Sequence, residues 1–542
     1  MCLGSVLYGS KALSGVTNLM TLKGGTAPLQ ATVKGGYDGT TGGDTLFASV
    51  HGMQDGWSYR LAAADSDHGL RRTPEGRAEN TSFENQGYYG FLEKAAGNHA
   101  LGLTWDRYES RSDIFVEEVA RSTFPLVDLA LSTPQRDRER YALDYTWEPA
   151  SAVLDRLLVS AFTQDSLRHF VSNTETVWYR RDIDTRSTLR SDGLLLQADW
   201  LPWGRHRVVT GLQYSNDEVR QGRQVDTLSW TPIASTGTER IDVQDHWALS
   251  DQLTAIIGAR YYQVDGELDR SNRPGLRAAP LDSDSHLIAS AGLNWSTGPG
   301  SALRANISEG YLYPSLMQLA TGAYAGSNFV NPNSELTPET SINYELGWRF
   351  MQGQWTVDAA LFFSDSSDYI DHIFCTRADN CLGPTDKVYR NIGSSNAHGL
   401  ELYLAWETAD QALQPYVNFT WMQRNNDFGS FDTWDTGIPA LAGRAGVMLE
   451  PQLNGLWQTL WADLYLRGES GSLLLEPGAR GLIETKRSGW ATLNAALGVS
   501  LGDNLLLAVE LQNLLDRDYR ESTENLLAPG RSASMKLTWN IN

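Results

Sequence analysis

The segment TLNAALGVSL (residues 492–501) decides the fold, because leucine, alanine or valine stands at every odd position from 493 to 501. The residues between them are polar or small. Side chains of a β-strand point alternately to its two faces, so this segment has one apolar face and one polar face. The same alternation recurs in ALRANIS (302–308), SINYELGWRF (341–350), GLELYLAWE (399–407) and SMKLTW (534–539). The pattern predicts an all-β protein.

Composition narrows the class of all-β protein. The chain has 542 residues and a net charge of −21, which argues against nucleic acid as a partner, since a polyanion would be repelled. Three cysteines exclude a scaffold built on disulfides. There is no apolar run of about 18 residues, which excludes a transmembrane helix. A soluble all-β protein and an outer-membrane β-barrel both fit.

Strand length and loop length favour the barrel. The alternating segments run for about 9–11 residues, the length that a tilted strand needs to cross a bilayer. Aromatic residues lie near their ends, as Trp348, Trp406 and Trp539 do. Short turns alternate with long connections that we expect to be polar, among them 311–338, 365–389 and 516–530. A soluble propeller is the alternative, but no repeat of about 40–50 residues is visible.

Five motifs resemble those of one known family, and they occur in the order found there. The segment LYGSKALSGVTNLMTLKGG resembles the end of the plug domain in TonB-dependent outer-membrane receptors. Four later segments resemble motifs of that family's barrel. The five segments are 7–25, SEGYLYPSLMQL (308–319), FVNPNSELTPETSINYELGWR (329–349), RNIGSSNAHGLELYL (390–404) and ELQNLLDRDYRES (510–522).

The resemblance implies a transmembrane antiparallel β-barrel of about 22 strands over residues 26–542. Residues 1–25 are then the C-terminal remnant of the plug domain. The rest of the plug, the TonB box and the signal peptide are absent from this sequence. The implied location is the outer membrane of a Gram-negative bacterium, with outer-membrane lipid around the barrel.

The resemblance also implies a function. It is the uptake of an iron chelate, a ferric siderophore or heme, energised in the full-length protein through the TonB-ExbB-ExbD complex. Iron or heme would be cargo, and no cofactor is expected. The sequence shows no GxSxG, HExxH, phosphate-loop or CxxC pattern, so we expect no enzyme and no metal site. The alternatives are a passive plugless pore, a receptor for cobalamin or a sugar, a surface adhesin and an outer-membrane enzyme.

Candidate ligand-binding residues lie on the long loops, where binding residues concentrate on a rigid scaffold. They are Tyr311, Tyr313, Tyr324, Asn331, Asn333 and His372. The segment STPQRDRERYALDYTWEP (132–149) resembles one found in the heme and hemoglobin receptor branch. Heme receptors typically carry a histidine in the interval that here reads MQLATGAYAGSNFV (317–330). Tyr324 is the one phenol in that interval, and a tyrosine can ligate heme iron.

Two cysteines flank TRADN in the loop IDHIFCTRADNCLGPTD (370–386). Thiols this close on an external loop are expected to form a disulfide between Cys375 and Cys381. The alternative is a metal site with His372, although two sulfur atoms and one imidazole make an incomplete ligand set.

Charged residues on the polar faces of the barrel strands are expected to point into the lumen. They are Arg304, Glu345, Arg349 and Glu401. They would hydrate the lumen, form ion pairs with the plug or line the path of the ligand.

Overall fold

A computed structural model of the chain describes most of its residues. The described ranges are 20–117, 124–202, 204–226, 228–272, 279–325, 328–376, 379, 381, 386–429, 431–451, 457–478 and 481–541. Most of the predicted plug remnant, residues 1–19, therefore lies outside the described residues. The division of the chain into 1–25 and 26–542 stays a prediction.

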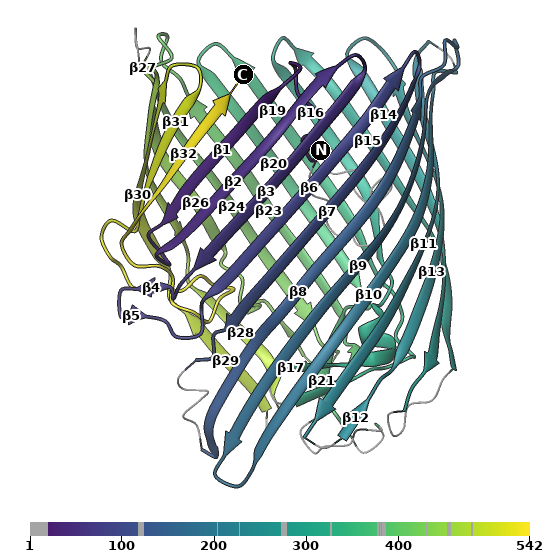
Figure 1. The fold of residues 1–542 in the computed structure, drawn as a ribbon, viewed down its shortest axis with the longest axis vertical. Helices are drawn as coiled ribbons and strands as arrows, with labels where there is room; N and C mark the ends of the chain where they lie inside the picture. Colours follow the sequence, from purple (N-terminus) through teal and green to yellow (C-terminus); the bar gives the residue numbers. More distant parts are fainter. Residues whose placement is uncertain are drawn as a thin grey trace.

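One large antiparallel sheet closes on itself and forms the barrel (Figure 1). Two short strands, β12 (Leu228–Trp230) and β25 (Asp432–Thr433), each pair with a single barrel strand. The remaining 22 strands form the ring, and β1 closes it by pairing with β32, with Ala31 opposite Ile541. The prediction of an all-β barrel of about 22 strands is therefore confirmed.

The strands of the ring, in order, are β1 (Gln30–Asp38), β2 (Gly43–Gln54), β3 (Trp57–His68), β6 (Phe83–Ala96), β7 (His99–Ile114), β8 (Leu126–Trp147), β9 (Leu154–Thr176), β10 (Arg180–Trp200), β11 (His206–Val225), β13 (Ile233–Ala248), β14 (Leu253–Arg270), β15 (Ala279–Gly298), β16 (Ser301–Leu312), β19 (Glu339–Gln352), β20 (Trp355–Ser367), β23 (Ser394–Trp406), β24 (Leu413–Asp427), β26 (Leu441–Leu449), β27 (Trp457–Glu469), β30 (Trp490–Leu501), β31 (Leu505–Gln512) and β32 (Ser532–Ile541).

The expected strand length of about 9–11 residues is wrong for many of these strands. Strand β9 has 23 residues and β8 has 22, and both extend at one end of the barrel well beyond their shorter neighbours (Figure 1). The expectation counted only the alternating apolar segment. The ladder continues past it, because hydrogen bonds between neighbouring strands need no apolar face.

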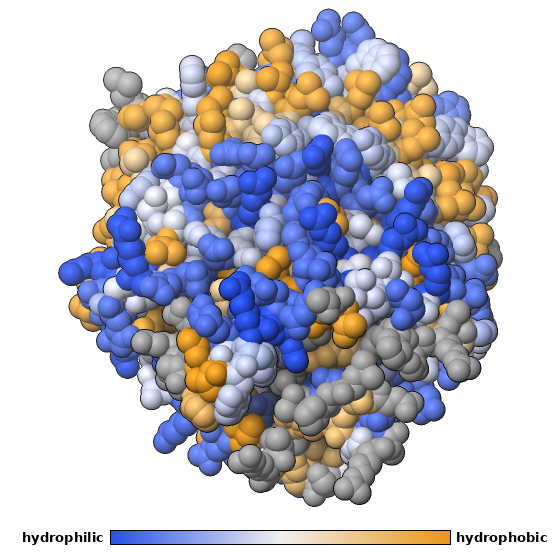
Figure 2. Space-filling view, turned by 60° about the horizontal axis from the view of Figure 1, so that its bottom comes forward, coloured by the Kyte–Doolittle hydropathy of each residue, from blue (hydrophilic) through white to orange (hydrophobic). Residues whose placement is uncertain are grey.

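The two faces of the wall differ as the alternation predicts. In β19, Ile342, Tyr344 and Leu346 are exposed on the outer face, whereas Ser341 and Gly347 on the other face are buried. Figure 2 shows apolar residues gathered toward the upper part of the molecule, and hydrophilic residues over much of the end that faces the viewer. The apolar flank is thus an outer surface, and the polar face is turned to the lumen.

The two rims of the barrel are also different. One rim, here called the turn rim, has tight connections such as Asp55–Gly56, where both residues adopt positive φ. The other, the loop rim, has the long connections and all the small elements. These elements are β4 (Arg72–Thr73), β5 (Gly76–Arg77), η1 (Met317–Thr321), β17 (Ala323–Ala325), β18 (Asn328–Asn331), β21 (Ile370–Phe374), β22 (Lys387–Asn391), β28 (Ser472–Gly478) and β29 (Gly481–Arg487), together with β12 and β25. Within the described residues, η1 is a five-residue π-helix, and no helix is long and apolar enough to span a membrane.

Candidate functional site

Two long connections of the loop rim join in a small sheet of their own. The loop between β16 and β19 contributes β17 and β18, and the loop between β20 and β23 contributes β21 and β22. The strand order is β17-β18-β22-β21, and we call this element the loop sheet. Strand β18 runs parallel to β22, with Val330 opposite Lys387. Segments more than 50 residues apart in sequence thus form one folded unit.

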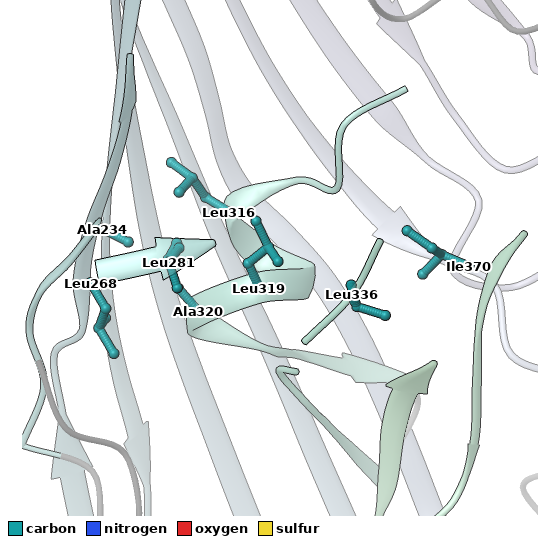
Figure 3. Packing of buried hydrophobic residues seen from close by; sticks show 8 residues of the cluster. All are labelled: Ala234, Leu268, Leu281, Leu316, Leu319, Ala320, Leu336 and Ile370. Atoms are coloured by element: carbon teal, nitrogen blue, oxygen red, sulfur yellow. The ribbon is translucent and has the colours of Figure 1, made fainter. Parts of the chain in front are cut away.

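An apolar cluster fixes the loop sheet to the barrel wall (Figure 3). Leu316, Leu319 and Ala320, in and beside η1, are buried against residues of three barrel strands. These wall residues are Ala234 of β13, Leu268 of β14 and Leu281 of β15, and Leu336 and Ile370 complete the cluster. The expectation that 311–338 is a polar external loop is wrong in this part, because its leucines form a buried core at the barrel mouth.

The Asn-Pro-Asn motif links the two loops. Asn331, which is 5% exposed, donates from Nδ2 to the Lys387 carbonyl at 2.9 Å and contacts Cys381 Sγ at 3.3 Å. Asn333 donates from Nδ2 to the Tyr389 carbonyl at 3.0 Å. Both asparagines therefore bond to the backbone of β22. Their predicted contact with a ligand stays a prediction.

A further link comes from Asn391, at the end of β22. Its Nδ2 donates to the carbonyls of Thr337 at 2.9 Å and Asp368 at 2.7 Å, and its Oδ1 accepts from the Thr337 N–H at 3.0 Å. Glu339 acts in a similar way, because its Oε1 accepts from the Ile370 N–H at 2.8 Å. Sequence reasoning did not name these two residues as part of a site, although each lies within a quoted motif. Their partners, which only the folded loops bring close, were not visible in the sequence.

Cys375 and Cys381 are joined in a disulfide, so their thiols are not available to a metal. Asp379 lies inside this small loop and accepts hydrogen bonds from the Thr376 N–H at 2.6 Å and its hydroxyl at 2.8 Å. Burial raises the pKa of Asp379, but these bonds and the ion pair with Arg390 outweigh it, so the pKa lies below its usual value. The loop is thus held by a carboxylate that stays charged above about pH 4.

The predicted ligand residues Tyr311 and Tyr313 hold the base of the first loop. Tyr311 is 1% exposed, stacks on Tyr262 and His286, and donates to Asp284 Oδ2 at 2.6 Å. Tyr313 donates to the Asp282 carbonyl at 2.6 Å. Burial and the nearby aspartates raise the pKa of Tyr313 to about 12. These contacts give both phenols a role in positioning the loop, and direct contact with a ligand stays a prediction.

The other two predicted ligand-binding residues, Tyr324 and His372, lie on the loop sheet. The backbone of Tyr324 pairs with Phe329 between β17 and β18, whereas its side chain lies outside the described residues. His372 lies on β21, where its Nδ1 is 3.4 Å from Asp371 Oδ1 and its ring faces Tyr389 at a centroid distance of 6.5 Å. In the part of the chain that the structure describes, no group of three or more His, Cys, Asp or Glu residues could hold a metal ion.

The four predicted lumen residues come together in the wall between β16 and β23. Arg304 Nε donates to Glu345 Oε1 at 2.8 Å, and its Nη1 donates to Asp358 Oδ1 at 3.1 Å. Arg304, Arg349 and Glu401 line a recess of about 750 Å³, which continues to Arg444 and Arg467. We call it the large recess. The sequence reasoning missed Asp358, which bridges Arg304 and Arg349.

Comparison with known proteins identifies this architecture. A family model described as "TonB dependent receptor-like, beta-barrel" matches residues 75–514, which is most of the chain. The chain belongs to the TonB-dependent receptor family. The barrel is therefore an outer-membrane barrel of a receptor family, and not an enzyme, in agreement with the sequence-based expectations.

Individual relatives are distant. The iron-regulated outer membrane virulence protein of Vibrio cholerae (strain O395) is 23% identical over 347 residues, which cover 61% of this chain and 48% of that protein. The ferrienterobactin receptor of Escherichia coli K12 is 30% identical over 242 residues, covering 41% and 31%. Among solved structures, the copper transporter OprC superposes with a TM-score of 0.79 at 14% identity, covering 96% of this chain and 84% of that one. This last likeness shows the fold alone. The chain spans about half the length of the Vibrio relative that it matches.

Proposed function

We propose that this chain is the barrel of a receptor that takes up an iron chelate, a ferric siderophore or heme, across the outer membrane. The names of two relatives support iron as the cargo, since one is iron-regulated and the other is a receptor for ferrienterobactin. The observation that carries the proposal is the loop sheet, a rigid element at the mouth of a receptor-family barrel. A preorganised loop loses less conformational freedom when a ligand binds, which favours the capture of a scarce compound.

The lumen supports transport rather than adhesion alone. Its wall has ion-paired arginines and carboxylates, as in the large recess, so a polar chelate would meet a hydrated surface along the barrel. Energy would come from the TonB-ExbB-ExbD complex acting on the plug of the full-length protein. A passive pore would need neither the complex nor a ligand-specific mouth.

Growth under iron limitation tests this proposal. The gene would be deleted in its own bacterium, and growth would be compared on heme and on a panel of ferric siderophores. We expect the deletion mutant to lose growth on at least one chelate, with growth restored by the wild-type gene. Growth on that chelate should also be lost in a strain without TonB.

Two results would contradict the proposal. Unchanged growth of the deletion mutant on heme and on every siderophore tested would exclude iron-chelate uptake under those conditions. Gene-dependent uptake that persists without TonB would instead favour the passive pore. Comparing heme with siderophores also tests the heme interpretation of Tyr324, since a siderophore receptor needs no iron ligand from the protein.

A further inference from the structure

A groove on the outer face of the barrel crosses strands β13, β14, β15, β16 and β19. Its volume is about 600 Å³, and we call it the outer groove. Among the side chains that line it, Val243, Ile257, Ala289, Ala291, Ile307 and Tyr344 are all exposed. They lie on the apolar flank of their strands, so the outer groove opens toward the surrounding membrane and not toward the lumen.

Small side chains form the floor of the outer groove. Along the outer face of β15, Ala289 and Ala291 lie between Leu287 and Leu293, and both leucines are exposed. Ala259 of β14 is directly opposite Ala289 in the ladder. Three alanines thus leave a hollow among larger apolar side chains. A hollow of this kind loses dispersion contacts unless a hydrocarbon chain fills it.

A carboxylate lines the end of the outer groove that is nearer the loop rim. The ladder between β15 and β16 ends at the pair Ser290–Ser308. The next residue of β16, Glu309, continues the contact with its side chain, because its Oε2 accepts from the Ala289 N–H at 2.9 Å. An anionic lipid head group would be repelled at this end of the outer groove.

Basic and aromatic groups lie beyond the other end, at the turn rim. Asp245 lines this end, and its Oδ2 accepts from His206 Nδ1 at 2.7 Å. The His206 ring stacks on Trp247 at a centroid distance of 5.2 Å. Arg205, which precedes His206 and is exposed, donates from Nη1 to the Leu249 carbonyl at 3.0 Å. A guanidinium beside an indole at the edge of the apolar belt suits the phosphate of a membrane lipid.

We propose that the outer groove binds one phospholipid, with an acyl chain over Ala259, Ala289 and Ala291 and with its phosphate at Arg205. The groove is continuous with the lipid-facing surface of an outer-membrane barrel, which identifies lipid as the occupant. The carboxylate of Glu309 at one end and the guanidinium of Arg205 at the other set the direction of the lipid. The chain fills the wall directly below the point where β15 and β16 part.

Native mass spectrometry of the purified chain in a mild detergent tests the site. The probe is dimyristoyl phosphatidylglycerol, and the comparison is dimyristoylglycerol, which has the same acyl chains and no phosphate. We expect the wild type to bind one phosphatidylglycerol saturably, about tenfold more tightly than dimyristoylglycerol. Ala291→Phe fills the outer groove and should weaken this binding about tenfold, and Ala259→Phe, on another strand, should do the same. Arg205→Gln should weaken the binding of phosphatidylglycerol and leave that of dimyristoylglycerol unchanged.

The matched control is Ala48→Phe, which should bind phosphatidylglycerol as the wild type does. Ala48 is exposed on the outer face of β2, between Leu46 and Val50, and it lies outside the outer groove. Resistance of the barrel to unfolding in detergent at room temperature shows that each variant is folded.

Three binding results would overturn the site: no saturable binding by the wild type, equal losses in Ala291→Phe and Ala48→Phe, or equal affinity for the two lipids. A wild-type dimer that Ala291→Phe dissociates would also overturn it, because the occupant would then be a second copy of the chain. None of these results depends on growth with iron, so the uptake proposal and this inference can fail separately.

Discussion

At the scale of single residues, the loop sheet depends on asparagine side chains that bond to backbone. Asn331, Asn333 and Asn391 together make four such hydrogen bonds between loops 313–338 and 368–393, and Asn331 also contacts the sulfur atoms of Cys375 and Cys381. A side-chain amide has both hydrogen-bond donors and an acceptor, so one asparagine can bond to unpaired backbone groups of two segments at once. The two asparagines of the Asn-Pro-Asn segment therefore have a structural role that does not depend on a ligand.

Asn391→Ala should loosen the loop sheet without opening the barrel. The change removes three hydrogen bonds, and each contributes about 0.5–1.5 kcal/mol net. We expect the free energy of local opening of β21 and β22 to fall by about 1–3 kcal/mol. Native-state hydrogen exchange of the amides in Ile370–Phe374 and Lys387–Asn391 measures this change.

The control for this prediction is Asn396→Ala. Asn396 lies on the neighbouring strand β23, and its side chain makes no hydrogen bond with the residues that the structure describes. Exchange in the loop sheet should be the same as in the wild type. If Asn391→Ala also left exchange unchanged, the hydrogen bonds of Asn391 would not be what holds the loop sheet together.

At the scale of elements, the helical turn η1 is the anchor of the loop sheet. Leu319 is 2% exposed and belongs to the apolar cluster that contacts β13, β14 and β15. A bulge shifts the register between β14 and β15, placing Leu281 opposite Gly266. Leu281 can therefore join Leu268 in the cluster, and the wall is shaped to receive the loop.

Leu319→Asp should detach the loop sheet from the wall. Burial of a carboxylate among leucines, added to the lost apolar contacts, costs more than the roughly 2–5 kcal/mol of a leucine-to-alanine change. We expect rapid proteolysis between residues 313 and 338, with an intact barrel. The matched variant is Leu515→Asp, since Leu515 is 73% exposed on another connection of the loop rim. Resistance of Leu319→Asp to protease, equal to that of Leu515→Asp, would show that the cluster is not the anchor.

The elements also show how far sequence reasoning reaches. Ile342, Tyr344 and Leu346 were assigned to one face correctly. Side chains alternate between the two faces of a strand, and every barrel strand has one apolar and one polar surrounding, so the alternation alone gives the face. Leu316 and Leu319 could not be assigned, since a single short turn has no repeating pattern. Tyr311 has an odd number, like the residues of β16 that point outward, yet its ring stacks on Tyr262 and His286. The β15–β16 ladder ends at the pair Ser290–Ser308, after which alternation no longer fixes the side.

The candidate site was predictable only in part for a similar reason. Proximity in sequence suggested the disulfide of Cys375 and Cys381, and strand parity suggested that Arg304, Arg349 and Glu401 share the lumen. The link between Asn331 and Lys387 spans 56 residues and depends on the parallel pairing of β18 with β22. Nothing in the local sequence specifies a pairing of that kind.

At the scale of the whole molecule, the closed ring separates an apolar surrounding from a polar lumen. Pairing of β1 with β32 leaves the ring no free edge, so the backbone groups of the wall are bonded within the sheet. Stability in the membrane should then depend on which face a side chain occupies, more than on its position along the chain.

A pair of arginine substitutions tests this dependence on the face. Leu361 is 54% exposed on the outer face of β20, between Trp355 near the turn rim and Phe363, whereas Thr420 of β24 lines the large recess. Leu361→Arg should destabilise the barrel in lipid vesicles by about 2–4 kcal/mol, since a charge near the middle of the lipid face loses its hydration. Thr420→Arg should change stability by less than about 1 kcal/mol, because its guanidinium stays in a hydrated lumen.

Urea unfolding of both variants in the same vesicles, followed by tryptophan fluorescence, measures the difference. Equal destabilisation by the two arginines, or a larger loss from Thr420→Arg, would mean that the apolar face does not meet lipid and that the inside-outside assignment of the barrel is wrong.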